Sequence, residues 1–396
     1  MGRIRHLIVI ALLVCGSAVS FAAPGIPAAQ AAQADWELDL GPEATFFPSL
    51  VVSLATLHLD AAADPRELGD PNGLLGVAVT APRDGAKVDV EIATASLISP
   101  SRITVTLPQK GKRYFIYPFL KYNADRMVYI RQPFAETVTA TLVLDGIPQG
   151  EKSGRITVRS INDCVYGYEE DGRWNDTSWL FAAYVNENHP VVENILKEAL
   201  ATDVVDSFAG YQGDTEDVQN EIEAIWTALA RRKIRYSSIN NSSAEAASIW
   251  SQHVRLLGEA LSARQANCVE GACLLASIFT KIGLDAYLVM VPGHMFVGVD
   301  LDEEGNEWLF LETTLLGDSD SSFEDAASEG GEQYEKYEDQ LGDDPRIRWR
   351  DKRPRKKGGA SGRDDLGIID IRVARELGIL PIREPEADNA RFWRVK

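Results

Sequence analysis

Residues 265–279, QANCVEGACLLASIF, determine how the second half of this 396-residue chain is interpreted. Asn267 is a favoured helix N-cap and Gly283 a favoured C-terminal stop, so the sequence predicts a helix that begins with Cys268. At about 100° per residue, Cys273 lies about 140° around this helix from Cys268, and the two sulfurs diverge. One face of the helix is predicted to point inward, with the members Cys268, Ala272, Leu275, Ala276 and Phe279.

Four roles are open to these two cysteines: a disulfide, a metal site, core packing or nucleophilic chemistry. Diverging sulfurs disfavour an intrahelical disulfide, and no second CxxC or HxxxH motif supplies further zinc ligands. Cys273, in mid-helix among apolar residues, is predicted to be a small core residue. Cys268 lies in the first turn, where N–H groups and the positive end of the helix dipole stabilise a thiolate and can receive an oxyanion. Position alone leaves Cys268 open between a nucleophile and a packing residue.

A cysteine nucleophile needs a base, and the base needs an orienting group. His294 opens a predicted strand after a Pro-Gly turn, and Glu312 stands on the next strand. If residues 303–305, EEG, form a three-residue hairpin loop with Gly305 in the left-handed conformation, Phe296 pairs with Glu312. His294 and Glu312 then share a face, roughly 7 Å apart at the backbone. A two-residue loop would put them on opposite faces, and a merely solvated His and Glu is the alternative.

Residues 1–34 have the features of a secretory signal peptide: Arg3 and Arg5, an apolar run over residues 7–14, and small residues with A-x-A sites. The run is too short to span a bilayer, so we expect no transmembrane segment after the signal is removed. A lipoprotein attached through Cys15 is disfavoured, because a bulky valine precedes it. The mature chain is therefore expected outside the cytoplasm, secreted or periplasmic.

The composition is that of a globular chain, with 45% hydrophobic and 25% charged residues, long enough for two ordinary domains. The formal charge is −19, and removal of the two N-terminal arginines would take it to −21. Such acidity disfavours nucleic acid and anionic membrane as overall partners. The mature chain keeps Cys164, Cys268 and Cys273, an odd number and too few for a disulfide scaffold, so at least one thiol is free or pairs between molecules.

Residues 35–162 are a succession of short β-prone runs separated by Pro, Gly, Asp and Asn. In residues 87–92, KVDVEI, apolar and charged residues alternate with the period of a half-buried strand. Their number and length predict a β-sandwich. The segment has no cluster of His, Cys and carboxylates, so we expect an accessory domain. Binding of carbohydrate or cell wall by it would rest on class analogy alone.

Residues 163–179 are interpreted as a linker. After it, residues 189–201 and 217–232 show helical periodicity, and strand-like runs follow the cysteine helix. Helices followed by a sheet predict an α+β domain over residues 174–317. Residues 318–396 are predicted to be a charged loop and a C-terminal return segment.

Within that last part, residues 318–344 are acidic and residues 346–357, RIRWRDKRPRKK, are basic. These opposite blocks predict a solvated, flexible loop, with binding of the basic block to an anionic surface as the alternative. Residues 365–380, DLGIIDIRVARELGIL, are predicted to form a short helical segment that packs back on the domain.

Residues 266–314, ANCVEGACLLASIFTKIGLDAYLVMVPGHMFVGVDLDEEGNEWLFLETT, resemble the transglutaminase-like superfamily, whose papain-like core has a Cys at a helix start, a His on a strand and an Asp on the next strand. The resemblance implies an α+β fold, with a papain-like transglutaminase core preceded by an all-β sandwich-like domain. It implies Cys268 as nucleophile, His294 as base and Glu312 as the acidic orienting group. Glu312 stands where most members have Asp, and ETT replaces DPT, so the longer side chain must fold back to reach the imidazole.

From this resemblance we expect an enzyme that acts on protein or peptide amide bonds by Cys-His-Glu acyl transfer. Hydrolysis is ranked ahead of cross-linking, because no acyl-acceptor site is recognisable. Gln252, Trp250 and the backbone N–H of Cys268 are candidates for the oxyanion hole. No cofactor or metal is expected, no nucleic acid partner is expected, and association with the cell envelope is compatible with export. The alternative is a chain that keeps the papain-like frame but serves in binding or assembly without catalysis.

Overall fold

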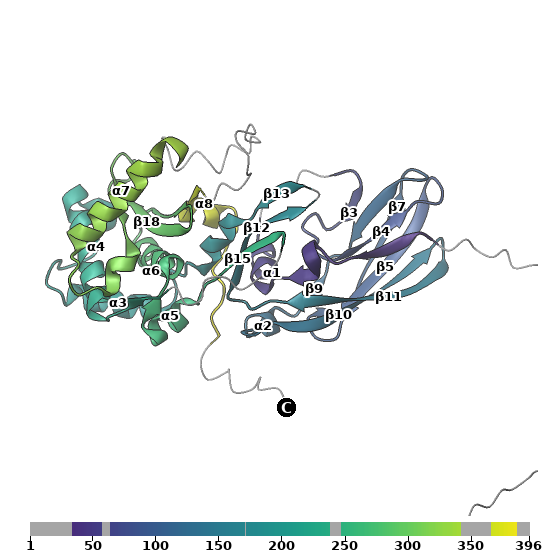
Figure 1. Ribbon diagram of the computed structural model, residues 1–396, viewed down its shortest axis with the longest axis horizontal. Coiled ribbons are helices and arrows are strands. Elements are labelled where there is room, and N and C mark those ends of the chain that lie inside the picture. Colours follow the sequence, from purple (N-terminus) through teal and green to yellow (C-terminus); the bar gives the residue numbers. More distant parts are fainter. Residues whose placement is uncertain (1–33, 58–63, 171, 238–246, 342–365, 386–396) are drawn as a thin grey trace, which may run out of the picture.

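The computed structural model of the protein has a mixed α+β architecture, in agreement with the sequence (Figure 1). Strands dominate up to residue 176, and helices and strands are mixed beyond it. The expected signal peptide, apart from Ala34, and the basic segment 346–357 lie outside the described residues. The described residues are 34–57, 64–170, 172–237, 247–341 and 366–385.

Two sheets make up the first unit, with the orders β1-β4-β8-β3 and β2-β11-β10-β5-β7. Most neighbouring strands are antiparallel, while β3 pairs with β8 and β2 with β11 in parallel. The strands of the first sheet are β1 (Trp36–Asp39), β3 (Glu67–Gly69), β4 (Gly76–Thr80) and β8 (Arg113–Tyr117). Those of the second are β2 (Thr45–Phe46), β5 (Ala86–Thr94), β7 (Ser101–Leu107), β10 (Phe134–Leu144) and β11 (Ile147–Val158).

The two sheets share one hydrophobic cluster. In β5, Val88, Val90 and Ile92 are fully buried and alternate with more exposed charged residues, as the sequence predicts. They lie in the same cluster as Val77 and Ile116 from the other sheet. Smaller elements complete this unit: η1 (Pro42–Ala44), β6 (Ile98–Ser99), β9 (Lys121–Tyr122) and α2 (Ala124–Met127).

Helix α1 (Pro48–Leu54) joins the two units. Val51 belongs to the cluster between the two sheets, whereas Leu50 belongs to the large cluster of the second unit. The hydroxyl of Ser49 donates to the backbone carbonyl of Asp163 at 2.7 Å. The two units are therefore packed through a shared helix, not only connected along the chain.

Residues 163–176 are not the linker that the sequence indicates. They form β12 (Asp163–Glu170) and β13 (Arg173–Asp176), which pair with β15 (Ile249–His253) in the order β13-β12-β15. Gly172, in the left-handed conformation with φ 69°, lies between β12 and β13, while Gly167 and Asn175 lie within the strands. The partner strand β15 lies far along the chain, where the local pattern cannot reveal it.

Helix α6 (Cys268–Lys281) is the centre of the second unit. Asn267 caps it as predicted, and Gly283 follows its end in the left-handed conformation with φ 88°. All residues from Val269 to Phe279 are buried. The prediction that only one face of this helix points inward is therefore wrong, because its other faces are buried too. The helix is buried on all sides because β18 packs on one side and α3, α5 and η2 on others.

The sheet beside α6 has the order β19-β18-β17-β20 and is antiparallel throughout. Its strands are β17 (Ala286–Val291), β18 (His294–Asp300), β19 (Trp308–Leu311) and β20 (Gly367–Asp370). In the hairpin of β18 and β19, Val297 pairs with Leu311 and Asp300 with Trp308, the register that places Phe296 opposite Glu312. Gly305 has φ 68°, so the predicted loop geometry and register are confirmed.

The prediction of an acidic loop is wrong for residues 323–341, which form helix α7 (Phe323–Leu341) (Figure 1). This helix packs against β19. Its buried residues recur at helical spacing: Phe323, Ala326, Gly330, Tyr334 and Leu341. The Tyr334 ring stacks on Phe310 of β19 with centroids 4.1 Å apart. The sequence analysis did not recognise this helix, because its few apolar residues are outnumbered by the acidic residues of its solvent-exposed face.

The C-terminal return packs on the second unit as predicted, but its first half is a strand. Residues 367–370 form β20 at the edge of the sheet, and α8 (Ile371–Glu376) follows. The remaining elements are η2 (Ser178–Tyr184), α3 (Pro190–Leu200), η3 (Gly210–Gln212), α4 (Thr215–Arg231), β14 (Arg235–Tyr236), α5 (Leu257–Ala263), β16 (Gln265–Ala266) and η4 (Thr313–Gly317). Helices α3 and α4 confirm the two helices predicted ahead of the cysteine helix. Within the part of the chain that the structure describes, no helix combines the length and apolar character needed to cross a membrane.

Candidate active site

The structure brings Cys268, His294 and Glu312 together from three elements. Cys268 is the first residue of α6, His294 the first of β18, and Glu312 follows β19 as the N-cap of η4. His294 Nε2 lies 2.6 Å from Glu312 Oε2, and the Cys268 side chain lies close enough to the ring to raise its pKa. Since Nε2 is engaged by Glu312, Nδ1 is the ring nitrogen that remains for the thiol. The order in space is thiol, imidazole, carboxylate, as a nucleophile, its base and an orienting group require.

The ring of His294 lies between two acidic groups. Burial by itself lowers the pKa of His294, but the hydrogen bonds and negative charges of Cys268 and Glu312 outweigh it and raise that pKa to about 10. The imidazole is therefore held as an imidazolium near neutral pH.

Glu312 is buried, and both of its oxygens have partners. Oε2 faces His294, while Oε1 accepts from the Thr314 backbone N–H at 2.9 Å and from the Thr314 hydroxyl at 2.6 Å. Burial raises the pKa of Glu312, but the hydrogen bonds from His294 and Thr314 outweigh it and hold that pKa below its usual value. Thr314 thus folds the longer glutamate side chain back toward the ring.

A buried ion pair fixes the start of α6. Glu270 accepts from the Asn267 backbone N–H at 2.9 Å, while the Asn267 side chain accepts from the Glu270 N–H, which completes a capping box. The same carboxylate binds Arg255 through its backbone N–H and its guanidinium, at 2.8–2.9 Å. The Glu270 side chain is 0% exposed and that of Arg255 is 13% exposed. The first turn, and Cys268 with it, is held from both sides.

A glycine lets the Glu312 segment approach the nucleophile helix. A Cβ atom at Gly271 of α6 would lie 2.7 Å from Thr313 Oγ1 and 2.9 Å from Thr313 Cβ. The Thr313 hydroxyl donates to the Cys268 carbonyl at 3.3 Å. Because Thr313 directly follows Glu312, this close contact sets how far the carboxylate lies from α6.

The two side chains among the oxyanion-hole candidates, Gln252 and Trp250, make different contacts. Gln252 of β15 donates through Nε2 to the His253 carbonyl at 3.2 Å, and that carbonyl also accepts from Asn267 Nδ2 at 3.3 Å. Gln252 therefore lies next to the residue that precedes Cys268. Trp250, two residues earlier on the same strand, packs its ring against that of Trp174, with centroids 5.0 Å apart.

Tyr236 is an exposed aromatic residue beside the site. It pairs with Ala266 in the parallel β14-β16 ladder, two residues before Cys268. Burial and the negative charges of Cys268 and Glu312 raise the pKa of Tyr236. Its side chain is 49% exposed, which makes it available to a bound substrate.

The other two thiols are inert core residues. Cys164 and Cys273 are buried, and burial raises the pKa of both, as the sequence predicts for Cys273. All three cysteines of the described residues are free thiols. Cys268 alone among them is partly exposed and adjacent to an imidazole.

Sequence reasoning missed several contributors, among them Thr314, Arg255 and Tyr236. The motif ETT offered a signal for Thr314, since a threonine two residues after an acidic residue can cap its carboxylate. Arg255 and Tyr236 reach the site through tertiary contacts, which local patterns do not encode. Among the residues described, no cluster of three or more His, Cys, Asp and Glu side chains could hold a metal ion.

The chain matches no protein-family model, and no curated protein matches it in sequence. The geometry of the site is therefore the basis for the functional assignment.

Proposed function

We propose that the protein is an exported thiol enzyme of the transglutaminase-like kind, acting on protein or peptide amide bonds by Cys-His-Glu acyl transfer. The observation that carries the proposal is the relation of Cys268, His294 and Glu312, with the imidazole hydrogen-bonded to Glu312 and close enough to Cys268 for that side chain to raise its pKa. Under this proposal the second unit is a papain-like core, and the two-sheet unit is a β-sandwich accessory domain. The helix that begins with a cysteine beside an antiparallel sheet supports that fold assignment.

In the first step, the thiolate of Cys268 attacks the carbonyl carbon of the amide. The imidazolium of His294 gives its proton to the departing nitrogen as the C–N bond breaks, which leaves a thioester on Cys268 and a neutral imidazole. The N–H groups at the start of α6 and the amide of Gln252 are the candidates to bind the oxyanion of the tetrahedral intermediate.

In the second step, the neutral imidazole accepts a proton from water as the water oxygen attacks the thioester carbonyl. The C–S bond breaks, and the acid product, the thiolate and the imidazolium are produced. An amine in place of water would give a cross-link by the same route. Hydrolysis ranks first, because no acyl-acceptor site is recognisable.

Glu312 keeps the ring in position and stabilises the imidazolium in both steps. Its low pKa means that it remains ionised near neutral pH, as this role requires. The rival proposal is a protein that has kept this frame for binding or assembly, and the experiment below separates the two.

Alkylation of the intact chain by iodoacetamide at neutral pH, read by peptide mass spectrometry, tests the nucleophile. We expect Cys268 to react much faster than the buried Cys164 and Cys273, and His294→Gln to slow Cys268 without changing the others. The His294→Gln comparison is needed because burial alone would protect the other two thiols. Equal reactivity of Cys268 in wild type and His294→Gln would favour the non-catalytic alternative.

Turnover is measured with casein as a general protein substrate, with peptide release reporting hydrolysis and incorporation of a fluorescent primary amine reporting cross-linking. Cys268→Ala should abolish either signal, while Cys273→Ala should keep it. Activity that survives in Cys268→Ala would overturn the proposal.

A further inference from the structure

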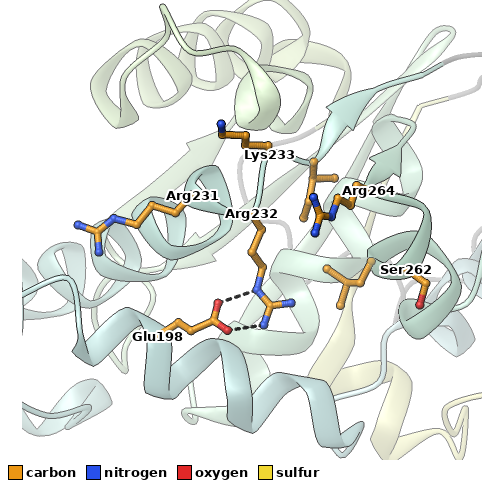
Figure 2. Close-up of a pocket in the computed structure, with 8 residues that line it drawn as sticks. Glu198, Arg231, Arg232, Lys233, Ser262 and Arg264 are labelled. Atoms are coloured by element: carbon orange, nitrogen blue, oxygen red, sulfur yellow. Dashed lines mark hydrogen bonds and ion pairs between the residues drawn. The ribbon is translucent and has the colours of Figure 1, made fainter.

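A pocket with a mainly cationic lining lies where the C-terminal ends of α4 and α5 meet (Figure 2). Its volume is about 720 Å³. Its charged lining consists of Arg231, Arg232, Lys233 and Arg264, with Glu198 as the one carboxylate. The chain as a whole has a net charge of −19, so this pocket is a positively charged region on a negatively charged protein.

Two of these cations are available to a ligand. Arg232 is engaged, since its guanidinium binds both oxygens of Glu198 at 2.7 and 2.8 Å, and Figure 2 shows Arg264 on the other side of the pocket. Arg231 donates to the Ala201 carbonyl at 3.4 Å. Lys233 and Arg264 are exposed and have no ion-pair partner within the described residues.

Both available cations stand at turns where glycine would be favoured. Lys233 has φ 56° and Arg264 has φ 52°, and the left-handed region is strained for residues with a side chain. The negative ends of the two helix dipoles favour positive charge at these positions. They do not account for a cavity between the turns that is lined by Lys233 and Arg264, two cations without an ion-pair partner within the described residues.

Short strands connect this pocket with the candidate nucleophile. Arg264 directly precedes β16, and Cys268 lies four residues after Arg264 in the chain. Four residues of extended chain span at most about 13 Å. In the paired strand β14, Arg235 and Tyr236 are exposed, and Tyr236 lies beside Cys268. The exposed residues Arg235 and Tyr236 thus lead from the turns that line the pocket toward the nucleophile.

We propose that the pocket binds an acidic segment of the protein substrate, rich in Glu or Asp, about four residues from the bond that Cys268 attacks. The inference rests on the proposed function and names its substrate class. A short acidic peptide fits better than a long polyanion such as nucleic acid, because the chain has a net charge of −19 and a long polyanion would extend beyond the local cations. Charges beyond about 10 Å are screened at ordinary ionic strength, so a short segment experiences mainly the local cations.

Binding is tested with the full-length Cys268→Ala variant and a fluorescein-labelled hexaglutamate peptide, by fluorescence anisotropy. We expect saturable binding that weakens as ionic strength rises, and little binding of the matched hexaglutamine peptide. An exposed ion pair contributes up to roughly fivefold in affinity, so Lys233→Gln with Arg264→Gln should weaken binding roughly tenfold. A double variant with the same charge change elsewhere, Lys110→Gln with Arg155→Gln in the two-sheet unit, should bind as the parent does. Arg264→Lys keeps the charge and should retain most of the affinity.

Equal binding of the two peptides, or unchanged affinity in the Lys233/Arg264 double variant, would overturn the inference. Tighter binding of an oligothymidylate of the same charge than of hexaglutamate would also overturn it and assign the pocket to nucleic acid. Because this readout uses an inactive variant, it is independent of turnover, and absence of casein cleavage by wild type would count against the proposed function alone. Where turnover is observed, the Lys233/Arg264 variant should raise KM for a peptide with an acidic segment and leave KM for its glutamine counterpart unchanged.

Discussion

His294 Nε2 and Glu312 Oε2 are 2.6 Å apart, and the carboxylate reaches the ring because Thr314 holds its other oxygen. A glutamate is one methylene longer than an aspartate, the residue that the proposed transglutaminase-like assignment leads us to expect at this position. The two hydrogen bonds from Thr314 to Oε1 take up this extra length by folding the side chain back. An ionised carboxylate thus lies against the imidazole, and substitutions of single side chains can test each of these contacts.

Glu312→Gln keeps the size of the side chain but removes its charge. We expect turnover to fall by a hundredfold or more, since loss of the orienting carboxylate in such triads costs roughly 10²–10⁴ in rate. The measurement is casein hydrolysis together with the rate of Cys268 alkylation. Glu307→Gln is the matched control, because this exposed residue on the same hairpin undergoes the same chemical change. Equal losses in the two variants would show that the charge of Glu312 has no special role.

Thr314→Val removes the hydroxyl that binds Glu312 Oε1 and keeps the shape of the side chain and the backbone N–H. Hydrogen bonds to charged groups contribute about 1.5–3 kcal/mol, so we expect turnover to fall by roughly tenfold or more, with less effect than Glu312→Gln. Thr314→Ser, which restores the hydroxyl, should recover most of the rate. A valine variant as fast as wild type would mean that the backbone N–H suffices to hold the carboxylate.

The hairpin register could be predicted from sequence, because strand side chains alternate with a period of 2 and Gly305 fixes the loop length. The same two facts predicted that His294 and Glu312 share a face. The start of α6 could also be predicted, because Asn267 carries its own capping chemistry. Both features depend on residues close together in the chain, so the sequence pattern is sufficient to predict them.

The predictions were wrong for segments whose structure depends on contacts with residues far away in the chain. β12 has its partner in β15, and the contact between Asp163 and His253 joins residues 90 apart in the chain. Helix α7 packs on β19 through few apolar residues, so its composition is that of a solvated loop although its spacing is helical. Arg255 enters the site only because Glu270 binds it, a pairing that no short motif contains.

The raised pKa of His294 predicts a pH-dependent stability. The pKa of the folded state, about 10, exceeds the ordinary value of about 6.5 for an unfolded histidine. The stabilising contribution of the imidazolium is therefore complete below about pH 6.5 and is lost as the pH rises through about 10. We expect the difference in unfolding free energy between wild type and His294→Gln to shrink over this range in urea denaturation. A difference that stays constant from neutral to alkaline pH would contradict the ionised pair.

Glu270→Gln tests the buried pair that holds the start of α6. It leaves Arg255 buried without its carboxylate, and loss of one partner of a buried pair costs about 3–5 kcal/mol. Glu198→Gln breaks the exposed pair with Arg232 and should change stability by at most about 1 kcal/mol. Urea denaturation of both variants provides the comparison. Similar losses in the two would refute a special role for the Arg255–Glu270 pair.

Gly271→Ala tests whether the close approach of η4 to α6 sets the site. The added methyl group would lie 2.7 Å from Thr313 Oγ1, so η4 must move away from α6 and carry Glu312 with it. Because alanine favours helix, we expect the fold to persist in circular dichroism, while turnover falls by up to about a hundredfold through misplacement of the carboxylate. Gly331→Ala in α7 is the control, since a Cβ atom there meets nothing within 4 Å. It should keep full turnover and stabilise the helix by up to about 1 kcal/mol. Wild-type turnover in Gly271→Ala would show that the site tolerates a displaced η4 and that Glu312 need not lie where the structure has it.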